Sequence, residues 1–157
     1  MSKKQYIEEA TKIEVADASS NTQQPGEPEN VRAQIISALK KHLESLNFNV
    51  EVFEIYVFDK DNLPLIIIKD TDDAVEAVSF ERIKHELSVS INLIASSYSK
   101  NDELLLKVLD RLKSFEGKFN FMELNAVNRS NIEVLDKDYV MTELRLSFVY
   151  HTQLWSV

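Results

Sequence analysis

The sequence predicts an α+β fold, a mostly antiparallel β-sheet packed against two main helices, with an N-terminal arm. Two segments, 31–46 and 101–115, carry apolar residues at the spacing of a helix that buries one face. Two others, 87–95 and 144–150, alternate apolar and polar residues as half-buried strands do. Helix-like and strand-like segments do not alternate regularly along the chain, and this order favours an antiparallel sheet.

The first 29 residues differ in composition from the rest, so we expect an arm over 1–29 and the α+β domain over 30–157. Residues 18–30 hold two of the three prolines and one of the two glycines, which is typical of a linker. Ahead of the linker, the spacing of Tyr6, Ile7, Ala10 and Ile13 predicts a short amphipathic helix that is marginal on its own. We expect this helix to dock, with a neighbouring copy as one candidate.

The first element of the domain is predicted to be a helix over residues 31–46. Its apolar residues repeat with the helical period, and charged residues occupy the opposite side. Asn30 stands directly before the stripe and is the expected N-cap. The stripe consists of Val31, Ile35, Ile36, Leu39, Leu43 and Leu46.

Two strands are predicted next, over residues 48–69, where β-branched and aromatic residues are dense. The apolar phase changes between Val52 and Phe53, so the first strand either contains a bulge or is covered on both faces. Pro64 has no amide proton, which places it at the start of the second strand or at an open edge. We expect Asp70 to Asp73 to form a charged turn after that strand.

The second half of the domain is predicted to contain strands at 75–80, 87–95 and 131–135 and a closing strand from residue 144. The strand at 87–95 is expected to have one buried and one solvated face. Ser99 and Asp102 have the spacing of a capping box at the start of the second helix. We expect the closing strand to be an interior or nearly interior member of the sheet. Core packing is the expected role of Phe48, Phe53, Phe148 and Tyr150.

The composition argues against several classes of protein. A net charge of -8, from 26 acidic and 18 basic residues, is unsuited to neutralising many phosphates on a nucleic acid. The absence of cysteine excludes disulfides and thiol chemistry. The chain has no apolar run typical of a signal peptide or a membrane span, so we expect a soluble protein that does not contact a membrane.

The sequence offers no convincing catalytic, cofactor or metal site. The histidines His42, His85 and His151 are expected on a solvated helix face and on polar strand faces, without further ligands at a recognisable spacing. Residues 59–62 begin like a calcium loop but are not followed by its glycine and final glutamate. With two glycines, the chain has no phosphate-binding loop and no nucleophile elbow. We therefore expect no enzyme, no cofactor and no bound metal.

The order and spacing of these elements resemble those of the tail terminator proteins of long-tailed bacteriophages. The resemblance covers most of residues 31–152. It is carried by the stretches "VRAQIISALKKHL", "LPLIIIKDTDD", "ELSVSINLIAS", "NDELLLKVLDRLKSF" and "LRLSFVYHT". The extension over residues 1–30 departs from the pattern, which leaves open a related tail completion or tail-to-head joining protein.

The resemblance implies a virion structural protein at the head-proximal end of the tail, present in the host cytoplasm during assembly. Such subunits form a hexameric ring that caps the tail tube, terminates its polymerisation and offers the head or neck a surface to join. The implied partners are copies of the chain, the tail tube protein, head-tail connector or neck proteins and, in contractile tails, the sheath, with DNA only passing through the lumen. The residues expected at subunit or partner contacts are Tyr6, Ile7, Phe53, Tyr56, Pro64, Asp70, Asp72, Asp73 and Trp155.

The residues themselves also favour an assembly role. A first strand that is apolar on both faces leaves one face for a neighbour. We expect the acidic residues at 59–61 and 70–73 to face the lumen or a ring surface, where negative charge keeps DNA from sticking. The alternative is a small-molecule-binding or enzymatic α+β domain that acts as a dimer.

Overall fold

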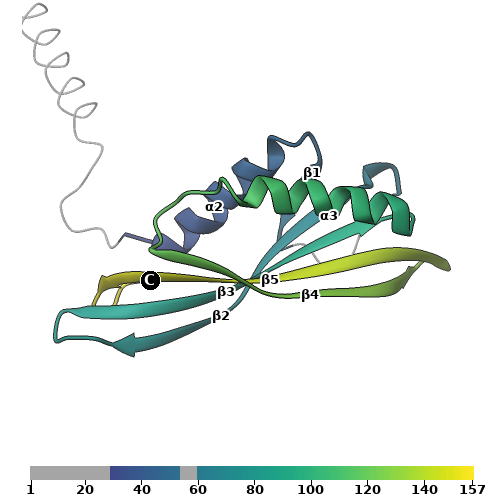
Figure 1. Ribbon diagram of the computed structural model, residues 1–157. Coiled ribbons are helices and arrows are strands. Elements are labelled where there is room, and N and C mark those ends of the chain that lie inside the picture. The colour runs from purple at the N-terminus through teal and green to yellow at the C-terminus, as the bar shows by residue number, and fades with distance from the viewer. Residues whose placement is uncertain (1–28, 54–59) are drawn as a thin grey trace, which may run out of the picture.

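The structure is a computed structural model that describes residues 29–53 and 60–157 (Figure 1). The described part has two layers, a five-stranded sheet and two helices that lie together on one face of the sheet. The helices are α2 (Val31–Glu44) and α3 (Tyr98–Leu112), and a short 3-10 helix η1 spans Lys60–Asn62. The strands are β1 (Asn49–Val52), β2 (Leu65–Ala77), β3 (Arg82–Ala95), β4 (Phe121–Val134) and β5 (Lys137–Gln153). These elements confirm the predicted α+β class.

The strands lie in the order β1-β2-β3-β5-β4. β1 runs parallel to β2, and every other neighbouring pair is antiparallel. β3 and β5 pair along the full length of β3, from Arg82 opposite Gln153 to Ala95 opposite Val140. β5 therefore lies between β3 and β4, which confirms that the closing strand is interior.

The main core lies between the helices and one face of the sheet. Alternate residues of β3 and β5 point to this face, and α2 and α3 each contribute a stripe at the helical period. The segments with the clearest predicted patterns thus build the centre of the fold. Core members include Ile35, Leu39 and Leu43 of α2, Leu104, Val108 and Leu112 of α3, Leu87, Val89, Ile91 and Leu93 of β3, and Leu144, Leu146, Phe148 and Tyr150 of β5.

The other face of the sheet carries a smaller apolar cluster and a band of small polar residues. The cluster is formed by Leu65, Ile67, Ile94 and Tyr139. Ser90, Asn92 and Ser147 are buried in the band, although the alternation predicts a solvated face there. The prediction is wrong because β3 and β5 are interior strands, so longer side chains of the flanking strands lie beside these small groups.

Both helices begin at a capped residue. The side chain of Asn30 accepts a hydrogen bond of 2.9 Å from the amide of Ala33, which confirms Asn30 as the N-cap of α2. At α3 the N-cap is Ser97, whose hydroxyl oxygen accepts from the amide of Lys100 at 3.3 Å. The predicted cap at Ser99 is wrong because Ser97 has the extended backbone of an N-cap, whereas Ser99 lies in the first helical turn.

The acidic stretch from Asp70 to Asp73 lies inside β2 and is not a turn. Pairing with β3 continues past it, with a bulge between Asp70 and Asp72, and the chain turns only at residues 78–81. The strand predicted at 75–80 is accordingly the end of β2 and the start of this turn. Residue types that favour turns stay in the strand here because β3 supplies a partner on both sides of the bulge.

Three boundaries test the remaining strand predictions. β4 begins at Phe121, ten residues or so before the predicted start. β1 ends at Val52, where the apolar phase changes. Phe53 has a φ of 63° and a side chain that is 55% exposed, so its predicted core role is wrong. The prediction for Pro64 is confirmed, because β2 starts at the next residue.

Asn101 supplies a test of how α3 is fixed to the sheet. It is fully buried in the first turns of α3, and its amide donates to the carbonyl oxygens of Leu93 at 2.9 Å and Val140 at 3.2 Å. Asn101→Ala leaves these groups and the Thr142 hydroxyl, which donates to Asn101, without their partner. We expect a loss of roughly 1–3 kcal/mol in the free energy of unfolding, measured by urea denaturation.

The matched control is Asn128→Ala on the exposed strand β4. We expect this change to stay within about 0.5 kcal/mol of the parent. Equal losses in the two variants would contradict the role assigned to Asn101.

Candidate functional site

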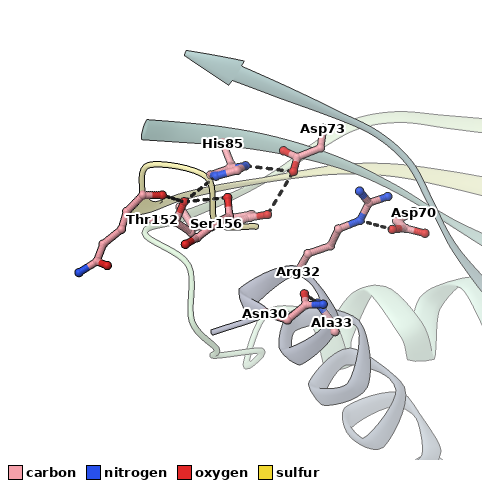
Figure 2. A network of polar contacts seen from close by, with 10 residues as sticks. Asn30, Arg32, Ala33, Asp70, Asp73, His85, Thr152 and Ser156 are labelled. Carbon is pink, nitrogen blue, oxygen red and sulfur yellow. Dashed lines mark hydrogen bonds and ion pairs between the residues drawn. The ribbon is translucent and has the colours of Figure 1, made fainter. Parts of the chain in front are cut away.

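A network of polar contacts joins the end of β5 to the hairpin of β2 and β3 (Figure 2). At its centre is His85 of β3, whose side chain is 1% exposed. Its Nδ1 atom lies 3.0 Å from Oδ2 of Asp73 on β2, and its Nε2 atom lies 2.8 Å from Oγ1 of Thr152 on β5. The imidazole therefore bridges the two strands that flank β3.

Tyr150 of β5 packs on the same histidine. The rings of Tyr150 and His85 are nearly parallel, with centroids 4.6 Å apart and 1° between their planes. The phenol hydroxyl donates to Oδ2 of Asp73 at 3.3 Å. Burial raises the pKa of Tyr150 well above its ordinary value, and the negative charge of Asp73 raises it further. The phenol therefore remains a neutral hydrogen-bond donor at physiological pH.

The bulge in β2 explains how two carboxylates reach the helix side of the sheet. Successive strand residues alternate between faces, so Asp70 and Asp73 would point in opposite directions in a regular strand. The bulge between Asp70 and Asp72 shifts this alternation by one residue. Asp70 forms an ion pair with Arg32 of α2, and Asp73 joins His85, as Figure 2 shows.

Asp73 is held through one of its two oxygens. Its side chain is 8% exposed, and Oδ2 contacts both His85 and Tyr150. Oδ1 is the only buried side-chain oxygen or nitrogen without a hydrogen-bond partner among residues 29–53 and 60–157. A buried carboxylate needs partners to replace its lost hydration, so this one depends on His85 and Tyr150. Within the described ranges, no three His, Cys, Asp or Glu side chains are grouped so that they could hold a metal ion.

Carboxylate, imidazole and hydroxyl stand here in the order that a nucleophilic triad uses. The surroundings of Thr152 favour a structural role instead. Its single hydroxyl proton is shared between the carbonyl oxygens of Gln153 and Ser156, which lie 3.1 Å and 3.2 Å from Oγ1. In a triad, His85 would act as the general base and accept the hydroxyl proton, but this proton is directed to the carbonyl oxygens. His85 is also buried beneath the ring of Tyr150. The network therefore fixes the turn after β5 to the sheet.

The structure revises the placement predicted for His42 and His85 and confirms the polar-face position predicted for His151. His85 lies on the helix face, not on a polar face, because the buried alternation of β3 extends back to include it. His151 points to the other face, where its Nδ1 lies 3.0 Å from Oδ1 of Asn120. The two strand histidines therefore do not meet. His42 is half-buried, not solvated, and its Nε2 lies 2.7 Å from the carbonyl oxygen of Arg111, which links α2 to α3.

β4 forms one edge of the sheet and exposes apolar side chains. Its outer side has no strand partner in the described part of the chain. Phe121, Leu124 and Val127 are 54%, 44% and 47% exposed, and we refer to them as the β4 margin. A long edge strand with exposed apolar residues is typical of a surface that another chain covers. The opposite edge is different, since β1 has four residues and is followed by the exposed Phe53.

A second exposed apolar region lies at the end of the sheet beside the polar network. Phe80, at the tip of the hairpin between β2 and β3, is 99% exposed, and Trp155, in the turn after β5, is 92% exposed. The amide of Leu154 donates to the carbonyl oxygen of Glu81 at 3.1 Å and holds this turn against the hairpin. The open hollow at this place, of about 1170 Å³, is here called the hairpin-end groove. Its lining includes Glu29, Val31, Phe80, Arg82, Leu154 and Trp155.

The contact residues predicted from the sequence lie in different surroundings. Three of them are exposed at separate places, namely Phe53, Asp72 and Trp155. Pro64 is half-buried in front of β2. Three others lie outside the described residues, namely Tyr6, Ile7 and Tyr56. The structure contains one chain, so the role of these residues at a partner surface stays a prediction.

Asp70 and Asp73 belong to the same prediction, but both carboxylates already have partners inside the subunit. Arg32 pairs with Asp70, and His85 pairs with Asp73. Asp72 is the member of the acidic stretch that faces solvent with its neighbour Thr71. A charged lumen or ring surface built from residues 70–73 would therefore present chiefly Asp72.

Sequence reasoning missed Phe80 and the β4 margin. Phe80 is a single aromatic residue directly before the charged Glu81 and Arg82. An aromatic residue isolated in this way was the signal in the sequence that could have indicated an exposed contact. β4 shows no clean period because both of its faces are largely exposed, so neither face is uniformly apolar.

Comparison with known proteins gives a likeness of structure. No family model and no curated protein matches the sequence. The structure is similar to a chain in the virion of a native gene transfer agent particle, with a TM-score of 0.53 over 76% of this chain and 96% of that chain. The two sequences are 11% identical, so the likeness shows a shared fold. None of the described helices is long and apolar enough to span a membrane.

The raised pKa of Tyr150 predicts how stability depends on pH. In the unfolded chain a tyrosine ionises near pH 10, whereas the folded protein retains the proton of Tyr150. The stabilisation is therefore complete below about pH 10 and is lost as the pH rises above it. Tyr150→Phe should lower the free energy of unfolding by about 0.5–1.5 kcal/mol at pH 8 and remove part of the alkaline slope.

Urea unfolding between pH 8 and pH 11 measures both effects. Tyr98→Phe is the matched control, because it makes the same substitution at a side chain that is 54% exposed. An unchanged slope in Tyr150→Phe would contradict the burial effect assigned to this phenol.

Proposed function

We propose that this protein is a virion structural subunit that assembles into a ring, caps the tail tube and ends its polymerisation. The ring, a hexamer by the sequence resemblance, then gives the head or neck a surface to join. Two independent likenesses support this role: the layout of the sequence, and the fold shared with a chain of a virion particle. The proposed site of action is the head-proximal end of the tail.

The observation that carries the proposal is the unlike character of the two sheet edges. The β4 margin exposes Phe121, Leu124 and Val127 along a 14-residue strand, whereas the opposite edge is the short parallel strand β1. Covering exposed apolar surface lowers the free energy of association. Unlike surfaces on one subunit join head to tail, and such contacts close into a ring when the rotation per subunit allows. Each contact should bury on the order of 800 Å² per partner.

The charge of the chain fits a passage for DNA. The net charge is -8, and the described acidic residues that face solvent include Asp61 and Asp72. Negative charge along a lumen repels the phosphate backbone, so DNA passes without adhering. The proposed protein partners are the tail tube protein and head-tail connector or neck proteins, with the sheath added in a contractile tail.

The second candidate, a dimeric enzyme or small-molecule-binding domain, has one specific observation in its favour. Asp73, His85 and Thr152 are aligned at hydrogen-bonding distances. A hydrolytic activity that is lost in Thr152→Val while the fold is retained would support this candidate. A dimer with a mass that tube protein does not change would support it as well.

The ring is tested by one substitution in the β4 margin. Val127→Asp places a charge where the next subunit is proposed to pack, so we expect the assembly to dissociate to single subunits. The parent should have a mass close to six times the 18.1 kDa of one chain, either alone or after addition of tube protein. Native mass spectrometry and light scattering measure these masses.

Asn128→Asp is the matched control, because it adds the same charge at the next residue of the strand, on the face opposite to the one that Leu124 and Val127 share. It should leave the ring intact, and both variants should retain the parent's thermal unfolding. A parent that remains monomeric with tube protein present, or a Val127→Asp variant that still forms the ring, would overturn the proposal.

A further inference from the structure

The hairpin-end groove is an apolar surface that the described residues leave open. Phe80 and Trp155 are almost fully exposed, and Leu154, which also lines the groove, is 45% exposed. Large aromatic groups held in such positions are typical of residues that pack against another segment. The turn that carries Trp155 is fixed by the amide of Leu154 and by the Thr152 hydroxyl, which donates to the carbonyl oxygen of Ser156. The surface is therefore held in place before anything covers it.

The N-terminal part of the chain enters the fold at this same groove. Glu29 and Val31 both line the groove. The amide of Val31 donates to the carbonyl oxygen of Val157 at 2.8 Å, which fixes the start of α2 next to the end of the chain. The 28 residues that precede Glu29 therefore begin at the rim of the groove and have a short distance to cover.

The sequence of this N-terminal part supplies an apolar surface of its own. Tyr6, Ile7, Ala10 and Ile13 fall on one side of the predicted helix. A helix of this length is marginal in water unless its apolar side packs against something. Both surfaces, the stripe and the groove, therefore lose water-exposed apolar area if they meet.

We propose that the N-terminal segment folds back on its own chain, so that the stripe of Tyr6, Ile7, Ala10 and Ile13 packs on Phe80 and Trp155 in the hairpin-end groove. The linker from residue 18 to 28 spans up to about 3.3–3.6 Å per residue, which is ample for a return to the rim. Its tether gives an effective concentration on the order of millimolar, which favours the chain's own segment over that of a separate copy in dilute solution.

Trp155 reports on this docking directly, because it is the only tryptophan in the chain. In the full chain we expect its fluorescence at shorter wavelength, and its quenching by acrylamide weaker, than in the double variant Ile7→Asp with Ile13→Asp. Both aspartates face the groove in the proposed arrangement, so the segment should be released and Trp155 should meet water.

The matched control is the double variant Gln5→Asp with Thr11→Asp. It adds the same charge on the other side of the predicted helix and should keep the emission of the parent. Equal emission and quenching in the parent and in Ile7→Asp with Ile13→Asp would overturn the proposal.

Crosslinking decides whether the segment comes from the same chain. The protein has no cysteine, so Ile13→Cys with Phe80→Cys introduces one defined pair. Oxidation should yield a crosslink within one chain, with the mass of a single subunit on a denaturing gel. Crosslinks that join two chains would overturn intramolecular docking.

This inference stands apart from the proposed ring. The fluorescence and crosslinking results can be obtained on a monomer as well as on a ring. A chain that never forms rings would contradict the ring while leaving the docking result intact.

Discussion

The fold depends on the antiparallel pairing of β3 with β5. This ladder runs the full length of β3, places Leu87 opposite Phe148 and Ile91 opposite Leu144, and so forms the floor on which both helices pack. The same register brings His85 opposite Tyr150. The polar network and the turn after β5 are therefore consequences of one pairing, and any shift by one residue would turn the whole core face outward.

The helices protect one face of this sheet and leave its margins open. At one end of the sheet, the network around His85 satisfies its polar groups inside the subunit. Asp73 and Tyr150 allow a carboxylate and an imidazole to be buried together. At the β4 margin, by contrast, the apolar side chains face solvent. A subunit with a firmly fixed interior and unlike open edges is suited to packing against copies of itself.

The sequence predicted those elements whose pattern is set by one buried face. The α2 stripe, its cap at Asn30, and the alternation of the closing strand around Tyr150 follow from local spacing, and the structure confirms them. Features that depend on a partner strand could not be predicted in the same way. The bulge after Asp70 depends on pairing with β3 on both sides of it, and it brings Asp73 to the face on which His85 is buried.

We propose that identical subunits close around an axis through unlike edges. Cryo-electron microscopy of the purified chain with tail tube protein tests this claim most directly, because class averages reveal both the symmetry and the element at the subunit boundary. We expect closed rings at tube ends, with β4 of each subunit against its neighbour. Single globules beside bare tubes, or particles with two-fold symmetry alone, would contradict it.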